Sequence, residues 1–117
     1  MECLARRTWF AARTVSFVLM AQLSVYRLAT GELVVDCQTD ELESLPTRFV
    51  APLLDPEHVP NPIKPLHPTF TIEGRKLVMA THTASAISRN ALGDPLHSLE
   101  GHRYTIIKAL DFLITGV

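Results

Sequence analysis

Five histidines are the side chains in this sequence that could bind a metal ion or transfer a proton near neutral pH. They are His58, His67, His82, His97 and His102. None of them forms an HxxxH pair, and no carboxylate lies at a matching offset, so the spacing that places metal ligands on one helix face is missing. The favoured interpretation is that they are solvated or hydrogen-bonded, and we expect no metal and no cofactor.

Two further sets of residues could carry acid–base or nucleophilic chemistry. Four carboxylates lie near one expected turn: Asp36, Asp40, Glu41 and Glu43. They include no obvious buried member, so a solvated acidic face is the favoured interpretation. Ser85, His82 and Asp94 could form a triad, but the Gly-x-Ser-x-Gly motif that presents a nucleophilic serine is absent. The sequence therefore predicts no catalytic residue and no enzyme.

Composition limits the class of protein. The chain has 117 residues, of which 47% are hydrophobic, and this suits one globular domain. Its 11 basic residues are offset by 12 acidic ones and are spread along the chain. Direct nucleic-acid binding, which needs a clustered basic surface, is therefore not expected. The two cysteines, Cys3 and Cys37, form no CxxC motif, and this favours a reduced, cytoplasmic protein.

The first residues resemble a secretion signal only superficially. Three arginines precede an apolar stretch, Val15–Val25, which is shorter than the about 20 residues needed to cross a membrane. We expect no membrane association. Met20 would serve as an ordinary start residue, and a strand-like pattern begins soon after it. The sequence therefore predicts that residues 1–19 are a mis-assigned extension and that residues 20–117 form the domain.

The elements that would position any site are mostly strands, indicated by alternating or β-branched apolar residues between turn residues. We predict strands at 23–26, 33–38, 49–51, 70–72 and 76–79, and a further extended stretch through 83–87. Six of the eight prolines lie between Pro52 and Pro68. Because proline lacks a backbone donor, we expect Pro52 to end the third strand. The proline-rich segment is predicted to be an ordered excursion from one barrel.

After Gly93 the apolar spacing becomes helical. The apolar stripe consists of Tyr104, Ile106, Ile107, Leu110, Leu113 and Ile114. Ser98 is predicted to cap the start of the helix, and Gly116 is predicted to end it. Short strands followed by one helix predict a mainly β fold, a small barrel with a C-terminal helix. The stripe is broader than one small barrel face needs, so we expect Ile106, Leu110 and Leu113 to contribute to a homodimer.

Five motifs occur in order along the chain. They are Val-Asp-Cys-Gln-Thr-Asp at Val35–Asp40, Arg-Phe-Val-Ala-Pro-Leu at Arg48–Leu53, Leu-His-Pro and Ile-Glu-Gly within Leu66–Gly74, Met-Ala-Thr and Ala-Ser within Leu77–Ile87, and the helical segment Ile106–Val117. Together they resemble the motifs of the CcdB family of bacterial toxins. The resemblance is collinear from about residue 22 to residue 117.

The resemblance implies an SH3-like barrel, of the kind shared with the MazF ribonuclease toxins, and a homodimer. It implies a cytoplasmic toxin of a type II toxin–antitoxin system, such as those that maintain plasmids. Such a toxin binds the A-type subunit of DNA gyrase, traps the enzyme on cleaved DNA, and is neutralised by a CcdA-like antitoxin. The residues implied to contact gyrase are Ile114, Thr115, Gly116 and Val117. Thr115 stands where the best-studied members have Trp, an aromatic anchor typical of interface hot spots.

Two other functions stay open on the sequence. The chain could be a repurposed module that binds an antitoxin without poisoning gyrase. It could also be a MazF-like endoribonuclease, which would need an arginine or a base beside a phosphate-binding surface. The arginines considered for this role are scattered along the chain at Arg27, Arg48, Arg75, Arg89 and Arg103.

Overall fold

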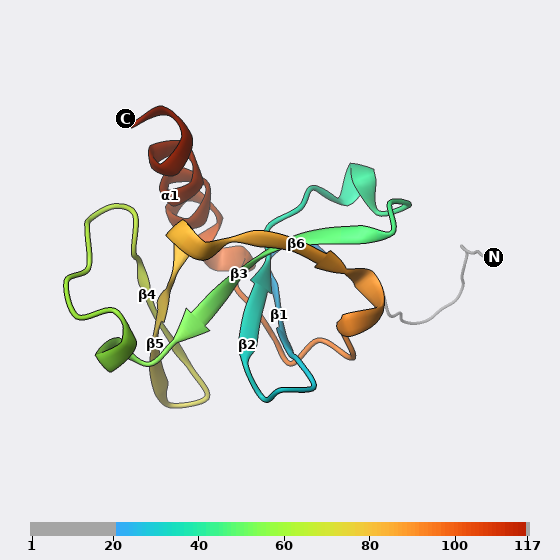
Figure 1. Cartoon of the computed structure of the whole chain (residues 1–117), viewed down its shortest axis with the longest axis horizontal. Coiled ribbons are helices and arrows are strands. Elements are labelled where there is room, and N and C mark those ends of the chain that lie inside the picture. Colours follow the sequence, from blue (N-terminus) through green and yellow to red (C-terminus); the bar gives the residue numbers. More distant parts are fainter. Residues whose placement is uncertain (1–20, 117) are drawn as a thin grey trace.

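The computed structural model describes residues 21–116, which form a curled antiparallel sheet followed by one helix (Figure 1). The strands are β1 (Ser24–Arg27), β2 (Leu33–Asp36), β3 (Thr47–Leu54), β4 (Thr69–Ile72), β5 (Arg75–Met79), β6 (Ser85–Ser88) and β7 (His97–Ser98). Helix α1 spans Arg103–Thr115. Short 3-10 turns join them: η1 (Asp40–Leu42), η2 (Pro56–His58), η3 (Thr81–Thr83), η4 (Arg89–Ala91) and η5 (Glu100–His102). The mainly β barrel with a C-terminal helix that the sequence predicts is confirmed.

Strand β3 is the centre of the sheet. The strand order is β4-β5-β3-β2-β1-β7, and β6 also pairs with β3. Along one edge β3 pairs with β2, from Leu53 opposite Leu33 to Val50 opposite Asp36. Along its other edge the first half of β3 pairs with β6 and its end pairs with β5. This change of partner lets one long strand bend the sheet into a barrel.

Pro52 does not end the third strand, and this prediction was wrong. It lies within β3, opposite Val34 of β2. Its carbonyl accepts a hydrogen bond of 2.8 Å from the backbone N–H of Ala80. The nitrogen of Pro52 faces the same edge, where β3 changes partner from β6 to β5, so no neighbouring strand needs a donor at this position.

The predicted strands 70–72 and 76–79 are confirmed as β4 and β5, which pair as a hairpin. Phe70 pairs with Leu77, and Ile72 pairs with Arg75. The two residues between the strands, Glu73 and Gly74, have φ angles of 53° and 78°. Two successive left-handed residues form the tight turn whose twist suits a two-residue hairpin, and glycine adopts this conformation without strain.

The main core lies between the curled sheet and the first turns of α1. It includes Leu23, Val25, Val35, Leu53, Phe70, Leu77, Met79, Leu99, Ile106 and Ala109. A second cluster on the other face of the sheet includes Tyr26, Val34, Val50 and Leu92. Neighbouring strand residues such as Val34 and Val35 therefore bury their side chains on opposite faces.

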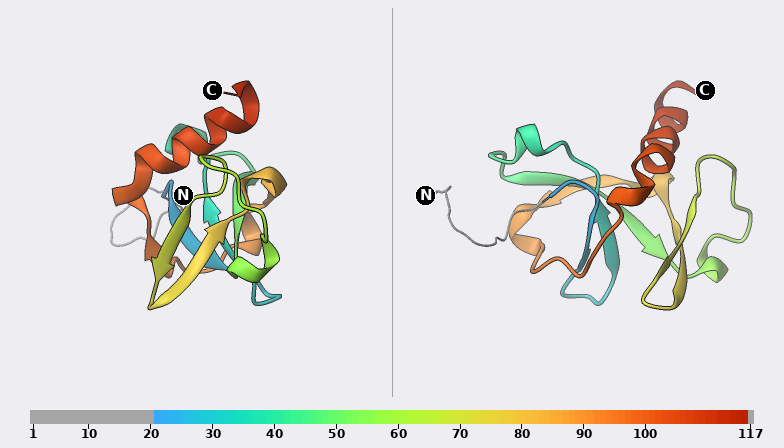
Figure 2. Two further views of the ribbon diagram at one scale, coloured as in Figure 1. Left: turned by 90° about the vertical axis from the view of Figure 1, so that its left-hand side faces the viewer. Right: turned by 180° about the vertical axis from the view of Figure 1, so that it is seen from behind.

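The helix begins later and faces the core differently from the prediction. It starts at Arg103, and Ser98 lies in β7, where its Oγ accepts from the backbone N–H of Glu100 instead of capping α1. The buried helix residues are Ile106 and Ala109, and Ala109 is the middle residue of α1. At the ends of the apolar stripe Tyr104 and Ile114 are exposed, because α1 packs on the core as far as Leu110 and its end then extends away from the barrel (Figure 2). No helix in the region 21–116 is long and apolar enough to span a membrane.

The proline-rich segment is ordered, as predicted. The backbone N–H of His67 donates to the carbonyl of Ile63 at 2.8 Å, and the N–H of Ile63 donates to Nδ1 of His67 at 2.9 Å. Val59 and Leu66 are buried against the barrel. Nε2 of His67 also lies 2.9 Å from Nδ1 of His82, so the segment is attached to the rest of the described structure.

The predicted extension, residues 1–19, lies outside the described residues and stays a prediction. A chain that starts at Met20 is expected to fold as well as the full chain, because β1 begins four residues later, at Ser24, and closes the sheet with β2 and β7. Thermal unfolding of both chains checks this. A loss of melting temperature of more than a few degrees would show that the extension stabilises the barrel.

Candidate functional site

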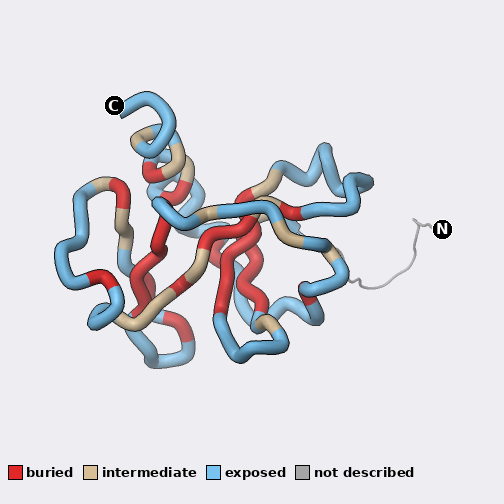
Figure 3. The backbone as a smooth tube through the Cα atoms, in the orientation of Figure 1, coloured by how far each residue is buried: buried red, intermediate tan, exposed pale blue. Residues whose placement is uncertain are grey.

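The outer half of α1 presents apolar side chains to solvent. Ile114 is 79% exposed and Leu113 is 41% exposed, although both are large and hydrophobic. In Figure 3 the last turn of the helix is exposed, and Figure 1 shows it standing clear of the sheet. Exposed hydrophobic residues that are adjacent to one another are typical of contact surfaces. Of the four predicted gyrase-contact residues, Ile114, Thr115 and Gly116 are exposed together here, and Val117 lies outside the described residues.

The backbone at the end of α1 is well defined. Gly116 has a φ of 80°, and its N–H donates to the carbonyl of Phe112 at 2.9 Å. This left-handed cap is the predicted helix end. The hydroxyl of Thr115 donates to the carbonyl of Asp111 at 2.7 Å, so the polar atom of this side chain is directed back to the helix. The surface at this end is therefore apolar around a closely approachable glycine backbone.

The acidic run contains a fully buried member, contrary to the prediction. Asp36 and Arg48 each have side chains that are 0% exposed, and Nη2 of Arg48 lies 2.6 Å from Oδ2 of Asp36. Nε of Arg48 donates to the same oxygen at 2.9 Å. Burial raises the pKa of the Asp36 carboxyl, and the hydrogen bond and charge of Arg48 oppose that rise. The burial of Asp36 was missed because it depends on the pairing of strands β2 and β3. The spacing of residues along the sequence does not show this pairing.

The other polar residues of the Val35–Asp40 motif also hold the barrel together. Oε1 of Gln38 accepts from the N–H of Phe49 at 3.0 Å, and Nε2 of Gln38 donates to the carbonyls of Leu42 and Thr47. Asp40 accepts from the N–H of Gln22 at 2.7 Å. The motif therefore has a structural role in this chain.

Two buried groups that could act as nucleophiles are poorly suited to do so. Burial is the main cause that raises the pKa of the Cys37 thiol to about 12 and that of the Tyr26 hydroxyl to about 12. Both therefore stay protonated at neutral pH, and a thiol without thiolate character is inert.

Two histidines that are distant in the sequence meet in the structure. Nε2 of His67 lies 2.9 Å from Nδ1 of His82, and their rings pack edge to face. Partial burial, and then the neighbouring His82, lower the pKa of His67. His58 lines the same cavity of about 440 Å³. The part of the chain that the structure describes nevertheless has no group of three or more His, Cys, Asp or Glu side chains arranged to hold a metal ion.

The arginines considered for phosphate binding each have a partner within the chain. Arg75 pairs with Asp55 at 3.1 Å, and Arg103 pairs with Glu100 at 2.9 Å. Arg89 donates to the carbonyl of Leu45, and Arg27 donates to the carbonyl of Gly31. His82 of the possible triad has His67 as its hydrogen-bond partner. No observation on these residues supports a nuclease or hydrolase site.

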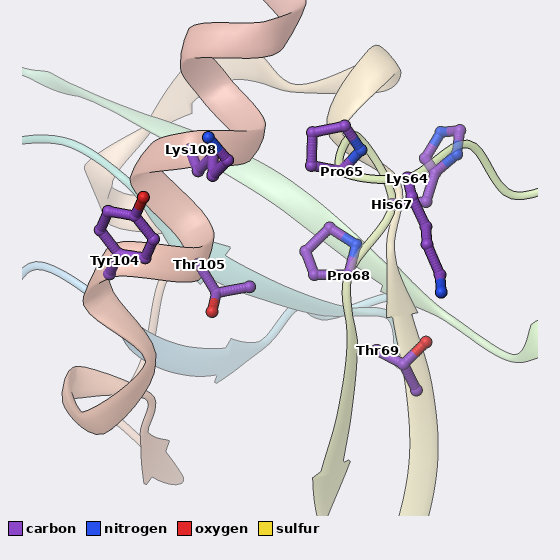
Figure 4. A pocket seen from close by; sticks show the side chains of 8 residues that line it. All are labelled: Lys64, Pro65, His67, Pro68, Thr69, Tyr104, Thr105 and Lys108. Atoms are coloured by element: carbon purple, nitrogen blue, oxygen red, sulfur yellow. The ribbon is translucent and has the colours of Figure 1, made fainter. Parts of the chain in front are cut away.

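A groove of about 360 Å³ separates α1 from the end of the proline-rich segment (Figure 4). Its walls are formed by Lys64, Pro65, His67, Pro68, Thr69, Tyr104, Thr105 and Lys108. Tyr104 is 76% exposed here, and the ammonium of Lys108 lies 5.9 Å from the centre of its ring. The sequence predicted Tyr104 as part of the core stripe, and its exposure on this groove was missed.

Comparison with known proteins adds one match. A family model described as CcdB protein matches residues 22–116, which is nearly the whole of the chain. No curated protein matches the chain.

Proposed function

Because the chain belongs to the CcdB family, the toxins of bacterial toxin–antitoxin systems, we propose that it poisons DNA gyrase. It binds the A-type subunits of the opened gyrase dimer, traps the enzyme on cleaved DNA without catalysing a reaction itself, and is neutralised by a small antitoxin. The observation that supports this proposal most directly is the exposed apolar end of α1.

The contact with gyrase uses the last turn of α1 and the residues after it. Ile114, 79% exposed, provides apolar area that loses water when a partner covers it. Gly116 carries no side chain, and no neighbouring atom lies within 4 Å of the position that a Cβ atom would take there. A partner's backbone can therefore approach it closely. No charged side chain lies between Asp111 and Gly116 in the sequence, so this surface can be desolvated at little cost.

The toxin acts as a homodimer in this proposal. Ile106 was expected to contribute to the dimer, but it is 0% exposed and belongs to the core of the barrel. Of the three residues expected to contribute to the dimer, Leu113 and the half-buried Leu110 are therefore left for a second copy.

At micromolar concentration the chain is expected to sediment as a dimer, and Leu113→Asp is expected to shift it toward monomer. A carboxylate at this position would have to be desolvated in an apolar interface. Lys76→Gln, on an exposed position of β5, is the control with the same change of one unit of charge. Sedimentation of the unaltered chain as a stable monomer contradicts the dimer.

The test of the proposed function measures gyrase–DNA cleavage complexes with the purified chain. The unaltered chain is expected to trap them, and Thr115→Trp is expected to lower the concentration needed by about tenfold or more, because an aromatic anchor adds contact area. Thr115→Val is the matched control, since it replaces the hydroxyl that donates to the carbonyl of Asp111 by a methyl group of similar size.

Three outcomes separate the functions. Trapping by the unaltered chain supports the poison. If the chain binds an antitoxin but traps no cleavage complex at any concentration, it is a repurposed module that only binds the antitoxin. If the same preparation cleaves RNA, and replacement of an arginine by a neutral residue abolishes this cleavage, the MazF-like alternative is favoured.

A further inference from the structure

The end of the proline-rich segment is closed by two hydrogen bonds between Ile63 and His67. The backbone N–H of His67 donates to the carbonyl of Ile63 at 2.8 Å, and the N–H of Ile63 donates to Nδ1 of the His67 ring at 2.9 Å. A backbone N–H can only donate, so Nδ1 of His67 accepts and carries no proton. The proton of the neutral His67 ring is therefore on Nε2.

This assignment fixes the protons of the second ring as well. Nε2 of His67 lies 2.9 Å from Nδ1 of His82 and, because it carries the proton, it donates to that nitrogen. His82 consequently carries its own proton on Nε2. The hydrogen bond between the rings and the one from Ile63 exist together only while both rings are neutral.

A proton added to the pair breaks at least one of these hydrogen bonds. On Nδ1 of His67 it would face the N–H of Ile63, and on Nδ1 of His82 it would face the N–H of the His67 ring. Reversing the bond between the rings does not remove the conflict, because it moves the proton of His67 to Nδ1, where it again meets the N–H of Ile63. Protonation is therefore incompatible with this arrangement.

The surroundings of the two rings also disfavour the charged form. His67 lines both the cavity of about 440 Å³ and the groove beside α1, and no carboxylate of the described residues lines either of them. The other titratable groups that line them are His58, Lys64, His82, Tyr104 and Lys108. Asp111, the acidic residue of α1, lines neither.

The direction of the pH effect follows from these surroundings. Partial burial, and then His82, lower the pKa of His67, so the observed arrangement favours the neutral ring. Its stabilising effect is present above about pH 6.5, the ordinary value for histidine, and is lost as the pH falls through the lowered pKa.

The two sides of this contact are attached to the barrel differently. His82 is part of η3, where Thr81 is 0% exposed and the N–H of Ala80 donates to the carbonyl of Pro52 in β3 at 2.8 Å. His67 belongs to the wall that the proline-rich segment forms opposite α1 (Figure 4). Loss of the contact therefore moves the segment and leaves η3 in place.

We propose that the contact between His67 and His82 is a pH-sensitive switch that holds the end of the proline-rich segment against η3. While both rings are neutral, the switch is closed. When the pair binds a proton, residues 63–67 separate from η3, and the cavity and the groove, which share His67 as a wall, widen. None of these residues belongs to the end of α1 that is proposed to contact gyrase, so the inference goes beyond the proposed function.

Nuclear magnetic resonance of the full chain tests the switch. At about pH 7.5 the rings of His67 and His82 are expected to carry a proton on Nε2 and none on Nδ1. Between about pH 7.5 and about pH 5, hydrogen exchange at the amides of Ile63 and His67, corrected for the intrinsic effect of pH, is expected to accelerate about tenfold or more. The amide of Met79, which donates to the carbonyl of Pro68, is expected to stay protected because the barrel remains folded.

Glutamine variants separate titration of these rings from other effects of acid. In the double variant with His67→Gln and His82→Gln neither position binds a proton. The corrected exchange at Ile63 is then expected to be independent of pH over the same range, whether the glutamines hold the segment closed or leave it open. His97→Gln, in β7, is the matched control and is expected to keep the pH dependence of the unaltered chain.

Several outcomes would overturn this inference. They are an unchanged corrected exchange rate at Ile63 in acid, a proton on Nδ1 of His67 at about pH 7.5, or a pH dependence that persists in the double variant. Loss of protection at Met79 together with Ile63 would show that acid unfolds the barrel instead of releasing the segment. Because these measurements contain no gyrase, their result is independent of whether the chain traps cleavage complexes.

Discussion

Removal of Gly116 and Val117 is expected to abolish growth inhibition and the trapping of cleavage complexes. Gly116 caps α1 from outside the barrel, and the buried residues of the helix, Ile106 and Ala109, lie at least seven residues before it. The truncation therefore removes contact surface without opening the core, and antitoxin binding is expected to stay nearly intact.

The controls separate loss of contact from loss of fold. The melting temperature of the truncated chain is expected to change by no more than a few degrees, because one exposed helix cap contributes only about 1 kcal/mol to the free energy of unfolding. Gly116→Asn is the matched variant, since asparagine tolerates the left-handed conformation but adds a side chain to the contact surface. It is expected to weaken trapping while the helix keeps its cap. Undiminished toxicity of the truncated chain would place the active surface elsewhere.

Replacement of Asp36 by alanine is expected to lower the free energy of unfolding by roughly 3–5 kcal/mol, the effect of removing one partner of a buried ion pair. The side chains of Asp36 and Arg48 are both 0% exposed, and Arg48 would stay inside the barrel with its positive charge. The carboxylate left near Arg48 would be that of Asp40, which is 58% exposed and lies 4.0 Å away. Urea unfolding followed by fluorescence or circular dichroism measures the change.

An exposed ion pair provides the matched control for this variant. Asp55 and Arg75 are joined at 3.1 Å, but their side chains are 39% and 54% exposed. Asp55→Ala is expected to cost less than about 1 kcal/mol, because water screens the charges and solvates Arg75 afterwards. A double replacement, Asp36→Leu with Arg48→Met, is expected to be less destabilising than Asp36→Ala alone. If Asp36→Ala and Asp55→Ala lowered the free energy of unfolding equally, burial would not strengthen the ion pair of Asp36 and Arg48.

The candidate site was predictable from the sequence only where the relevant signal is local. Gly116 ends the helix as expected, since a left-handed cap depends on one residue and its neighbours. The exposure of Tyr104 was not predictable. Its spacing with the other apolar residues of α1 is helical, but helical spacing does not state which face of a helix meets the barrel.

Local patterns in the sequence determined the strands, the Glu73-Gly74 turn and the helix, because alternation, turn residues and helical spacing act over a few residues. They also carried the motifs of the CcdB family. Tertiary structure alone decided that Asp36 is buried with Arg48, that His67 meets His82, and that Pro52 lies within a strand. Each of these depends on which strands and loops become neighbours. Which strands and loops become neighbours depends on burial of the whole core. The free energy of that burial comes from contacts between residues far apart in the chain.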